Sequence, residues 1–527
     1  MDVDRLSALP DRVLSRVLSF LDAGDASRVM IITRRSRTLY RQTDAVVLDT
    51  ESYGWCGYDG ERVGWLLFGD AMADVLAGGR CPVRELIVFV SSFYQPDFCA
   101  RVMRASPGME ALLAAPAMQR LEDLRVELEA EFGSTCGAYE LPASRLPCCR
   151  SLRSLDLTGC TLGPPGAAAF VCLETLRLES CESSLENLQA MLDAAPSLAA
   201  LHLEHVVFTS DELGHGWHAV MLRQSYRVRC PAAVVDVALL HCHSTDGLYL
   251  DAPNVRSLRY EGFLKHFPFS SRQLPAPAPN PRHVELSFCD GGRCVNRSSM
   301  EEVQFHAFFW ESIGSFSHLQ ILNLKLKHVK DIAVGREQED KLLKVFQELK
   351  VLEVEGCCKV DGDGDGAALP IANLLQCCPA LQEFQLKSRD PDSKAEHWID
   401  DPEKMRALVA FDRSMRWRAR LGSNKTCPSC GIEDDGCDDM DDLHVLKAPS
   451  IPCLDAHLKR VRLEFELECF DCFELKLAKF LVENATVLEE MEIRGGDRRV
   501  YDHIQHKLAQ WRANSDRSRI NIAWRAQ

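Results

Sequence analysis

The chain has 527 residues, of which 46% are hydrophobic and 26% charged, and its formal net charge is −16. These values are typical of a globular protein with more than one core, and the acidic excess disfavours binding to nucleic acid or to anionic membranes. No apolar run approaches the roughly 20 residues of a membrane span and the polar start predicts no secretory signal, so we expect a cytoplasmic or nuclear protein.

The first segment with a clear pattern is an amphipathic helix. Pro10 suits the first turn of a helix, because the N–H that proline lacks is not needed there. Apolar residues then recur at helical spacing and form one stripe. Two further short helices are expected before residue 41, and three such helices cannot bury this much apolar surface among themselves. The stripe is therefore predicted to bind a partner protein. Its members are Val13, Leu14, Val17, Leu18 and Leu21.

The order of these residues resembles an F-box. A Leu-Pro-Asp start at residues 9–11 is followed by two aliphatic pairs and by Arg34 and Arg35, and Ser36 stands where many plant members have Trp. The resemblance covers residues 4–45. It implies a three-helix module that docks on a Skp-type adaptor of a cullin–RING ubiquitin ligase. The adaptor-binding residues that it implies are Leu9, Pro10, Leu14, Val17, Leu18 and Leu21.

From residue 45 onward the chain repeats a strand pattern. Residues 152–162 match L-x-x-L-x-L-x-x-N/C-x-L, the pattern of a leucine-rich repeat, at each fixed position. Clear copies follow at Leu173 and Leu198. Weaker ones begin near Val83, Leu121, Val255, Leu319, Leu349 and Leu381, and residues 284–289 supply another strand.

This repetition predicts the fold class. One repeat cannot bury its apolar side alone, so neighbouring repeats must stack and share a core. We expect an α/β fold, namely an irregular leucine-rich-repeat solenoid over residues 46–388. Its parallel sheet would form the concave face, with helices such as 184–192 and 371–376 and loops outside. Segments 209–230 and 266–282 are expected to be loop insertions.

The pattern breaks over residues 389–450, where an acidic run with few apolar residues predicts a flexible acidic insertion. Strands resume at Leu458 and Leu488, with an amphipathic helix expected over residues 474–485. Residues 458–493 resemble the FBD domain that closes many plant F-box/leucine-rich-repeat proteins, so we expect FBD-like terminal repeats over residues 451–527. With the three modules in family order, the chain resembles the plant F-box/leucine-rich-repeat/FBD proteins.

Two stretches have partial metal-ligand patterns. Residues 361–366 begin like a calcium loop, but Ala372 stands at the twelfth position, where a bidentate Glu is required, so a surface loop is the better interpretation. A cysteine pair at residues 427 and 430 has zinc-knuckle spacing, but its second pair is poorly spaced, and free thiols are favoured. We therefore expect no metal and no cofactor. The candidate zinc ligands are Cys427, Cys430, Cys437 and His444.

Catalytic residues are not predicted. Cys160, Cys181, Cys289 and Cys357 fall at the N/C position of the repeat or its counterpart, where a small buried side chain supports the turn, and buried thiols are generally inert. The sequence contains no phosphate-binding loop, nucleophile elbow or zinc-protease pair. We therefore expect a non-catalytic protein.

The resemblance implies the substrate-recognition subunit of an SCF-type (Skp–cullin–F-box) ubiquitin ligase. Its partners would be the Skp-type adaptor and a target protein that the sequence does not identify, without nucleic acid or membrane. Two alternatives stay open: a leucine-rich-repeat scaffold that recruits no ligase, and a zinc-binding regulatory protein. Candidate target contacts are outward positions of the strands, namely Arg153, Asp156, Arg177, Glu179, His202, Arg259 and Lys325.

Overall fold

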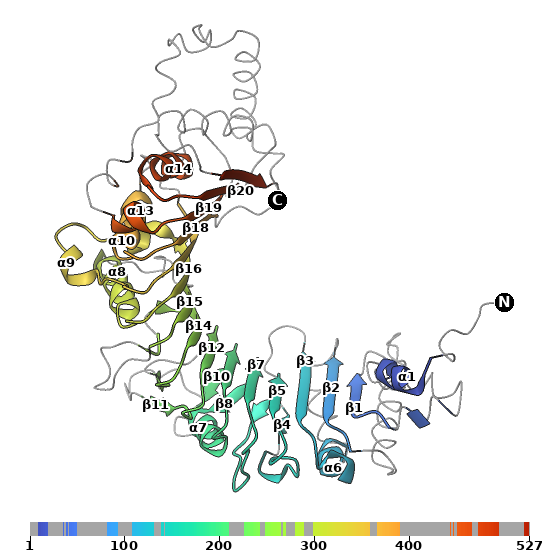
Figure 1. The fold of residues 1–527 in the computed structure, drawn as a ribbon. Coiled ribbons are helices and arrows are strands. Elements are labelled where there is room, and N and C mark those ends of the chain that lie inside the picture. The colour runs from blue at the N-terminus through green and yellow to red at the C-terminus, as the bar shows by residue number, and fades with distance from the viewer. Residues whose placement is uncertain are drawn as a thin grey trace, which may run out of the picture. The chain divides into compact units, whose positions relative to one another are not determined.

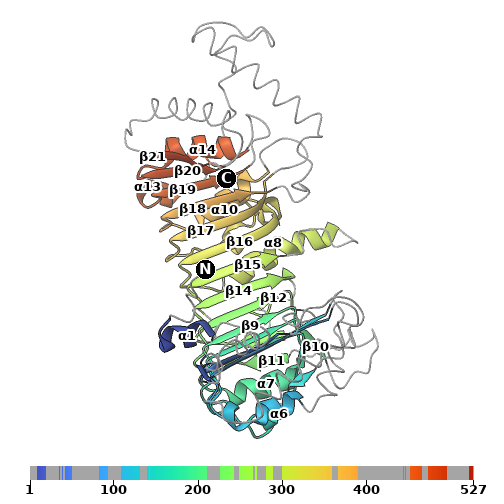
Figure 2. The ribbon, with the colours of Figure 1, turned by 90° about the vertical axis from the view of Figure 1, so that its right-hand side faces the viewer.

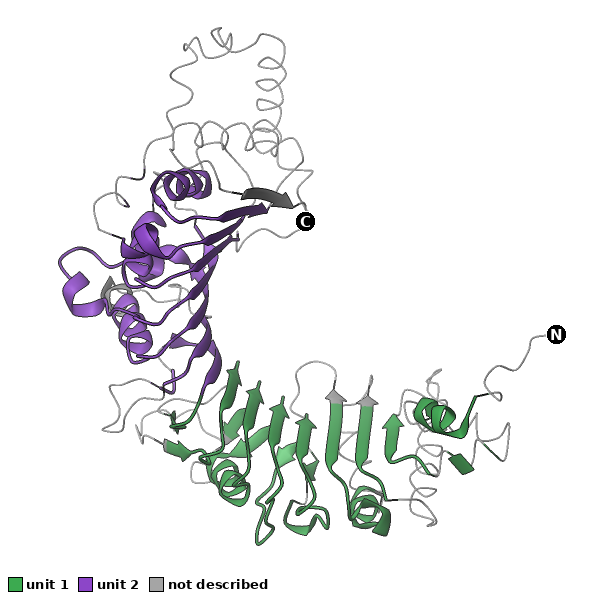
Figure 3. Cartoon of the chain, in the orientation of Figure 1, with its two compact units in different colours: residues 1–255 green, residues 256–527 purple. Residues whose placement is uncertain are grey.

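The computed structural model divides the chain into two compact units, unit 1 (residues 1–255) and unit 2 (residues 256–527), as Figure 3 shows. Within the described part, no helix has the length and apolar character needed to cross a membrane. The residues that the structure describes are 9–18, 35, 38–39, 42–49, 82–92, 108–130, 139–141, 143–209, 226–242, 248–264, 267–269, 280–288, 299–358, 366–389, 443, 446, 451–465, 473–494 and 521–525.

Unit 1 is built on a parallel sheet whose strands follow one another in chain order (Figure 1). Along β5, β7 and β9, buried and outward residues alternate with a period of two. In β5, for example, Leu155 and Leu157 are fully buried and Asp156 between them faces outward. The strands of this sheet are β1 (Ala45–Asp49), β2 (Glu85–Ser92), β3 (Asp123–Ala130), β5 (Ser154–Thr158), β7 (Thr175–Glu179), β9 (Ala200–Glu204) and β12 (Asp236–Leu240).

Short parallel strands and helices form the returns of unit 1. Strands β4 (Glu140–Leu141), β6 (Thr161–Leu162), β8 (Glu182–Ser184) and β10 (Val207–Thr209) form a second sheet, and β11 (Tyr226–Arg229) pairs with β13 (Leu248–Asp251). The Ser184 hydroxyl accepts a hydrogen bond from the Asn187 N–H (3.1 Å) and caps α7. The helical elements are α1 (Asp11–Leu18), α6 (Gly108–Ala114), η2 (Pro116–Met118), η4 (Ala143–Arg145) and α7 (Leu185–Ala194).

Four successive strands of unit 1 end in a residue with left-handed backbone conformation. At the first three of these corners, because the residue turns the chain sharply, its N–H reaches the last carbonyl of the next strand. Gly159 donates to Glu179 (2.9 Å), and Ser180 donates to Glu204 (2.8 Å). At the first three of these corners the chain passes from the main sheet into the second one. The four corner residues are Gly159 (φ 67°), Ser180 (φ 51°), His205 (φ 50°) and His241 (φ 49°).

The residue after each of the first three corners is fully buried, as the N/C position of the repeat predicts. Cys160, Cys181 and Cys357 are buried, which confirms their expected packing role, whereas Cys289 lies outside the described residues. The Cys181 thiol donates to the Leu157 carbonyl of the neighbouring repeat (3.2 Å). Burial raises the pKa of the Cys181 thiol to about 12, so this thiol is neutral and structural.

Unit 2 repeats the same plan, with parallel strands in chain order (Figure 2) and helices along one face of the sheet (Figure 1). Its strands are β14 (Ser257–Gly262), β15 (His283–Phe288), β16 (Ile321–His328), β17 (Val351–Cys357), β18 (Glu383–Ser388), β19 (Arg460–Glu464), β20 (Glu490–Arg494) and β21 (Asn521–Arg525). Its helices are α8 (Ser299–Ile313), η8 (Val329–Ile332), α9 (Glu339–Leu342), α10 (Ala368–Gln376), α13 (Pro452–Ala456) and α14 (Phe473–Asn484).

The core of unit 2 contains large aromatic residues and a few satisfied polar groups. The fully buried Trp310 donates its indole N–H to the carbonyl of Ile332 (2.8 Å). The buried Asn373 accepts a hydrogen bond from the Val334 N–H through its side-chain oxygen (2.9 Å). These bonds fasten α8 and α10 to the chain around η8, because each removes the cost of a buried, unpaired polar group.

The expected repeat strands and the helices over 184–192, 371–376 and 474–485 are present. Two expected insertions differ in part: residues 226–229 form β11, and Phe267 belongs to a buried aromatic cluster. Strands β18 and β19 pair directly, with Glu383 opposite Arg460, although the expected acidic insertion lies between them in the chain. Most of that insertion, its zinc candidates, residues 361–365 and most of the expected second and third N-terminal helices lie outside the described residues.

Candidate protein-binding surfaces

Helix α1 has one buried and one exposed apolar side. Leu14 and Leu18 are 1% and 0% exposed, whereas Val13 and Val17 are 45% and 36% exposed. The carbonyl of Pro10 accepts hydrogen bonds from the N–H groups of residues 13 and 14 (both 2.9 Å) and so starts the helix directly after the proline. The two valines lie one helical turn apart on the same side. They leave an exposed apolar strip on α1.

Arg35 joins the later part of the F-box-like motif to the start of this helix. Its Nη2 donates to the carbonyl of Leu9 (2.6 Å), and its Nε donates to Oδ1 of Asp11 (2.7 Å). A carboxylate in the first turn also interacts favourably with the helix dipole. The guanidinium group of Arg35 therefore links this part of the motif to its Leu-Pro-Asp start and fixes how the chain enters α1.

The residues implied as adaptor contacts occupy different environments. Pro10 and Val17 are exposed, Leu9 is half-buried, and Leu21 lies outside the described residues. Leu14 and Leu18 are buried, so in this structure they pack the helix and are not accessible to a partner. Among the described members of the stripe Val13 is the most exposed, although the resemblance does not include it among the adaptor contacts.

Four of the candidate target contacts meet on the outward face of the unit 1 sheet. Asp156, Arg177 and His202 occupy the same position on adjacent strands. The guanidinium of Arg177 contacts Oε2 of Glu179 (2.8 Å) and Oε2 of Glu204 (3.4 Å) and lies 3.9 Å from Asp156. His202 contacts the same oxygen of Glu204 (3.0 Å). We call this group, with Arg177 at its centre, the Arg177 network.

The electrostatics of the network follow from these contacts. The hydrogen bond from His202 lowers the pKa of Glu204, and the hydrogen bond to Glu179 raises the pKa of Arg177. Burial raises the pKa of Asp156, an effect that the nearby arginines oppose without cancelling. The network is thus an ordered set of charges held across three repeats. Arg153 lies apart from it and pairs with Glu174 (2.8 Å).

The two candidate contacts in unit 2 share one partner. Arg259 lies 3.2 Å from Oε2 of Glu285, and Lys325 donates to Oε1 of the same carboxylate (2.8 Å). Burial of Glu285 opposes its ionisation, but the hydrogen bond and the positive charges outweigh burial and lower its pKa. Sequence reasoning missed Glu285, although its outward position in a weak repeat copy was the available signal.

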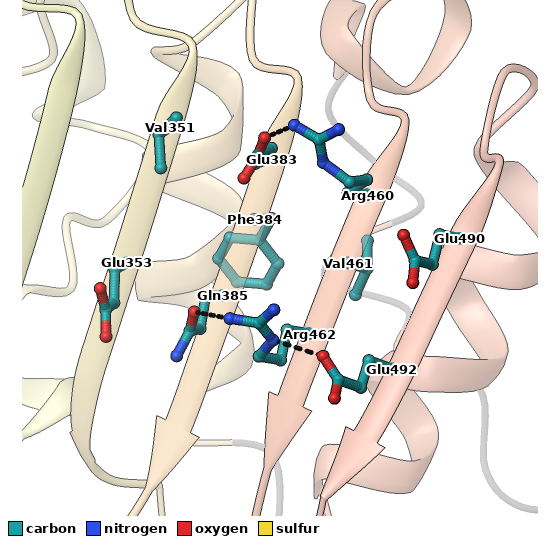
Figure 4. Close-up of a pocket in the computed structure, with 10 residues that line it drawn as sticks. All are labelled: Val351, Glu353, Glu383, Phe384, Gln385, Arg460, Val461, Arg462, Glu490 and Glu492. Carbon is teal, nitrogen blue, oxygen red and sulfur yellow. Dashed lines mark hydrogen bonds and ion pairs between the residues drawn. The ribbon is translucent and has the colours of Figure 1, made fainter. Parts of the chain in front are cut away.

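A shallow pocket opens on the same face, over β17 to β20 (Figure 4). Arg462 spans two strands there, because its Nε donates to Glu492 (2.6 Å) and its Nη1 donates to Gln385 (3.2 Å). Arg460 forms an ion pair with Glu383. None of these residues was predicted as a contact. The pocket is lined by Val351, Glu353, Glu383, Phe384, Gln385, Arg460, Val461, Arg462, Glu490 and Glu492.

The described residues offer little to metal or covalent chemistry. Among them, no group of three or more His, Cys, Asp or Glu side chains is placed to hold a metal ion. Several thiols there have raised pKa values because they are buried, including Cys148 at about 11. Such thiols are poor nucleophiles near neutral pH. The arrangement of charged, outward-facing side chains is suited to binding another macromolecule.

Comparison with known proteins gives two matches. A family model described as "FBD-associated F-box protein At5g56370, LRR repeats" matches residues 109–266, the segment that holds the Arg177 network. The F-box/LRR-repeat name is also carried by an Arabidopsis thaliana protein, At3g58880, which is 27% identical to this chain over 410 residues. That alignment covers 73% of the chain and 77% of the relative.

Proposed function

Since the chain belongs to the plant F-box/leucine-rich-repeat/FBD proteins, we propose that it is the substrate-recognition subunit of an SCF-type ubiquitin ligase. Residues 4–45 would dock on a Skp-type adaptor, residues 46–388 would hold a target protein, and residues 451–527 would form an FBD-like end. The acidic insertion, residues 389–450, would lie between the last two. The observation that carries the proposal is the exposed apolar strip on α1, at the start of a chain with this family relationship.

The adaptor contact would be made by Pro10, Val13 and Val17. Covering the exposed part of each valine would contribute roughly 1 kcal/mol from apolar surface alone. Leu14 and Leu18 would support this contact indirectly, by packing the helix that presents it. The ion pair between Arg35 and Asp11 would fix the direction of α1. Docking of this kind would join two preformed surfaces, without chemistry by this chain.

The repeats would contribute recognition. Their outward strand faces carry ordered charges, and a target held there would have its lysines near the ubiquitin-transfer machinery. Proximity of this kind raises the effective concentration of the acceptor, while other subunits supply the catalytic groups. We propose that the target is a protein and that the complex works in the cytoplasm or nucleus. The proposed target contacts are Arg153, Asp156, Arg177, Glu179, His202, Arg259 and Lys325.

The test is recovery of a purified plant Skp-type adaptor by the immobilised full-length chain. Replacing Val13 and Val17 by Asp together should lower recovery at least about tenfold, because two charges would enter an apolar contact. Val171→Asp is the matched control, since Val171 is also 45% exposed but lies in a turn of unit 1.

The control should bind like wild type, and circular dichroism should show all three proteins equally folded. Equal adaptor recovery by wild type and the double variant would reject docking through α1. If the folded wild type recovers no adaptor, the scaffold function replaces the ligase function.

A further inference from the structure

The pocket over β17 to β20 has carboxylates in excess over guanidinium groups. Arg460 is paired with Glu383, and Arg462 is held between Glu492 and Gln385. Within the described residues, the carboxylates of Glu353 and Glu490 have no ion-pair or hydrogen-bond partner. These two groups line opposite walls, one on β17 and the other on β20 (Figure 4). The pocket therefore presents two available negative charges with a neutralised floor between them.

The spacing of the two carboxylates follows from strand register. Glu353 aligns across the sheet with Glu492, and Glu490 lies two residues earlier on β20. Three strand spacings of about 4.8 Å and an offset of two residues of about 3.3 Å each separate their Cα atoms by roughly 16 Å. In an extended peptide, residues four apart point the same way and lie about 13 Å apart. Because lysine and arginine side chains are long, they can span the difference between these two distances.

The wall of β17 also suits the stem of such a side chain. Val351 lies two residues before Glu353 on the same face and lines the pocket with it. Lysine and arginine commonly lay their methylene groups on apolar surface while the charged end reaches a carboxylate. An acidic ligand would instead meet the two unpaired carboxylates and find both arginines already engaged.

We propose that this pocket binds an extended segment of the target protein that carries two basic residues four positions apart. One basic residue would contact Glu353 and Val351, and the other would contact Glu490. The middle one of the three residues between them would lie over the paired floor formed by Gln385 and Arg462. The proposal rests on the proposed function only in naming a target protein as the source of the segment.

The test measures binding of a fluorescent nonapeptide to the purified full-length chain by anisotropy at low ionic strength. The peptide has two lysines four positions apart among glycines and serines. Glu353→Gln and Glu490→Gln should each weaken binding about threefold, and the double variant about tenfold, as for exposed ion pairs. Glu337→Gln makes the same charge change at an exposed position outside the pocket and should have no effect.

Two peptide controls complete the experiment. A peptide with glutamates in place of the lysines should not bind, and one with adjacent lysines should bind more weakly. If the variant with both Glu353→Gln and Glu490→Gln binds the first peptide as tightly as wild type does, the proposal is overturned. Binding of the acidic peptide as tightly as the first peptide also overturns it. The variant with both Glu353→Gln and Glu490→Gln should recover the Skp-type adaptor as well as wild type does. Loss of peptide binding and loss of adaptor docking are therefore separate outcomes.

Discussion

The corner at Gly159 allows a sharp test of how the repeats of unit 1 are joined. Its φ of 67° disfavours any side chain, and a Cβ at this position would clash with the carbonyl oxygen of Leu128 on the preceding strand. The left-handed conformation costs alanine about 1–2 kcal/mol relative to glycine. Relief of the clash requires movement of backbone, which adds at least a comparable amount. Gly159→Ala should therefore destabilise unit 1 by about 3 kcal/mol.

Ser180→Gly is the matched change at the equivalent corner of the next repeat. It relieves left-handed strain at φ 51° but increases the freedom of the unfolded chain, so the two effects of about 1 kcal/mol should nearly cancel. Urea denaturation, with hydrogen exchange of β3 and β5 read by mass spectrometry, measures both variants. If the free energy of unfolding of Gly159→Ala is within about 0.5 kcal/mol of that of wild type, the left-handed corner does not constrain how the repeats are joined.

Three further predictions concern the core, pH and thiols. Trp310→Phe leaves the carbonyl of Ile332 unpaired and creates a cavity, so urea denaturation should show a loss of about 2–4 kcal/mol. The folded-state pKa of Glu492 is below its ordinary value of 4.5, because hydrogen bonds from two arginines outweigh the effect of burial. The stability that ionised Glu492 contributes is therefore fully present above pH 4.5 and is lost as the pH falls through the folded-state pKa. Glu492→Gln should therefore lose less thermal stability than wild type when the pH falls from about 6 to about 3. Maleimide should label the exposed Cys172 well before the buried Cys160, as peptide mass spectrometry would show.

The strands were predictable where leucines alternate with polar residues, as in residues 152–157. Strand β12 was not predicted, because Val237 and Leu239 do not continue a complete leucine consensus. Phe267 lies in a segment whose prolines suggested an insertion, yet it packs in the core. Whether such a residue lies in a strand or in the core depends on tertiary burial, which local composition does not reveal.

The candidate binding surfaces, like the fold, could be predicted from the sequence only in part. A helical stripe containing Leu14 and Val17 is visible in the sequence, but which side faces the protein depends on neighbours that the pattern does not name. Arg177 was predicted as an outward residue, whereas its bond to Glu204 depends on register between separate repeats. The pocket residues were missed for this reason, because each strand contributes only two or three of them.

The most direct measurement is immunoprecipitation of the tagged full-length chain from plant cells, with the cullin quantified by mass spectrometry. The proposed function predicts that wild type and Val171→Asp recover the Skp-type adaptor and the cullin together. The Val13→Asp, Val17→Asp variant, expressed to the same level, should recover neither. Recovery of the cullin by the double variant at the wild-type level would contradict docking through α1, and its absence from the wild type would contradict a ligase subunit.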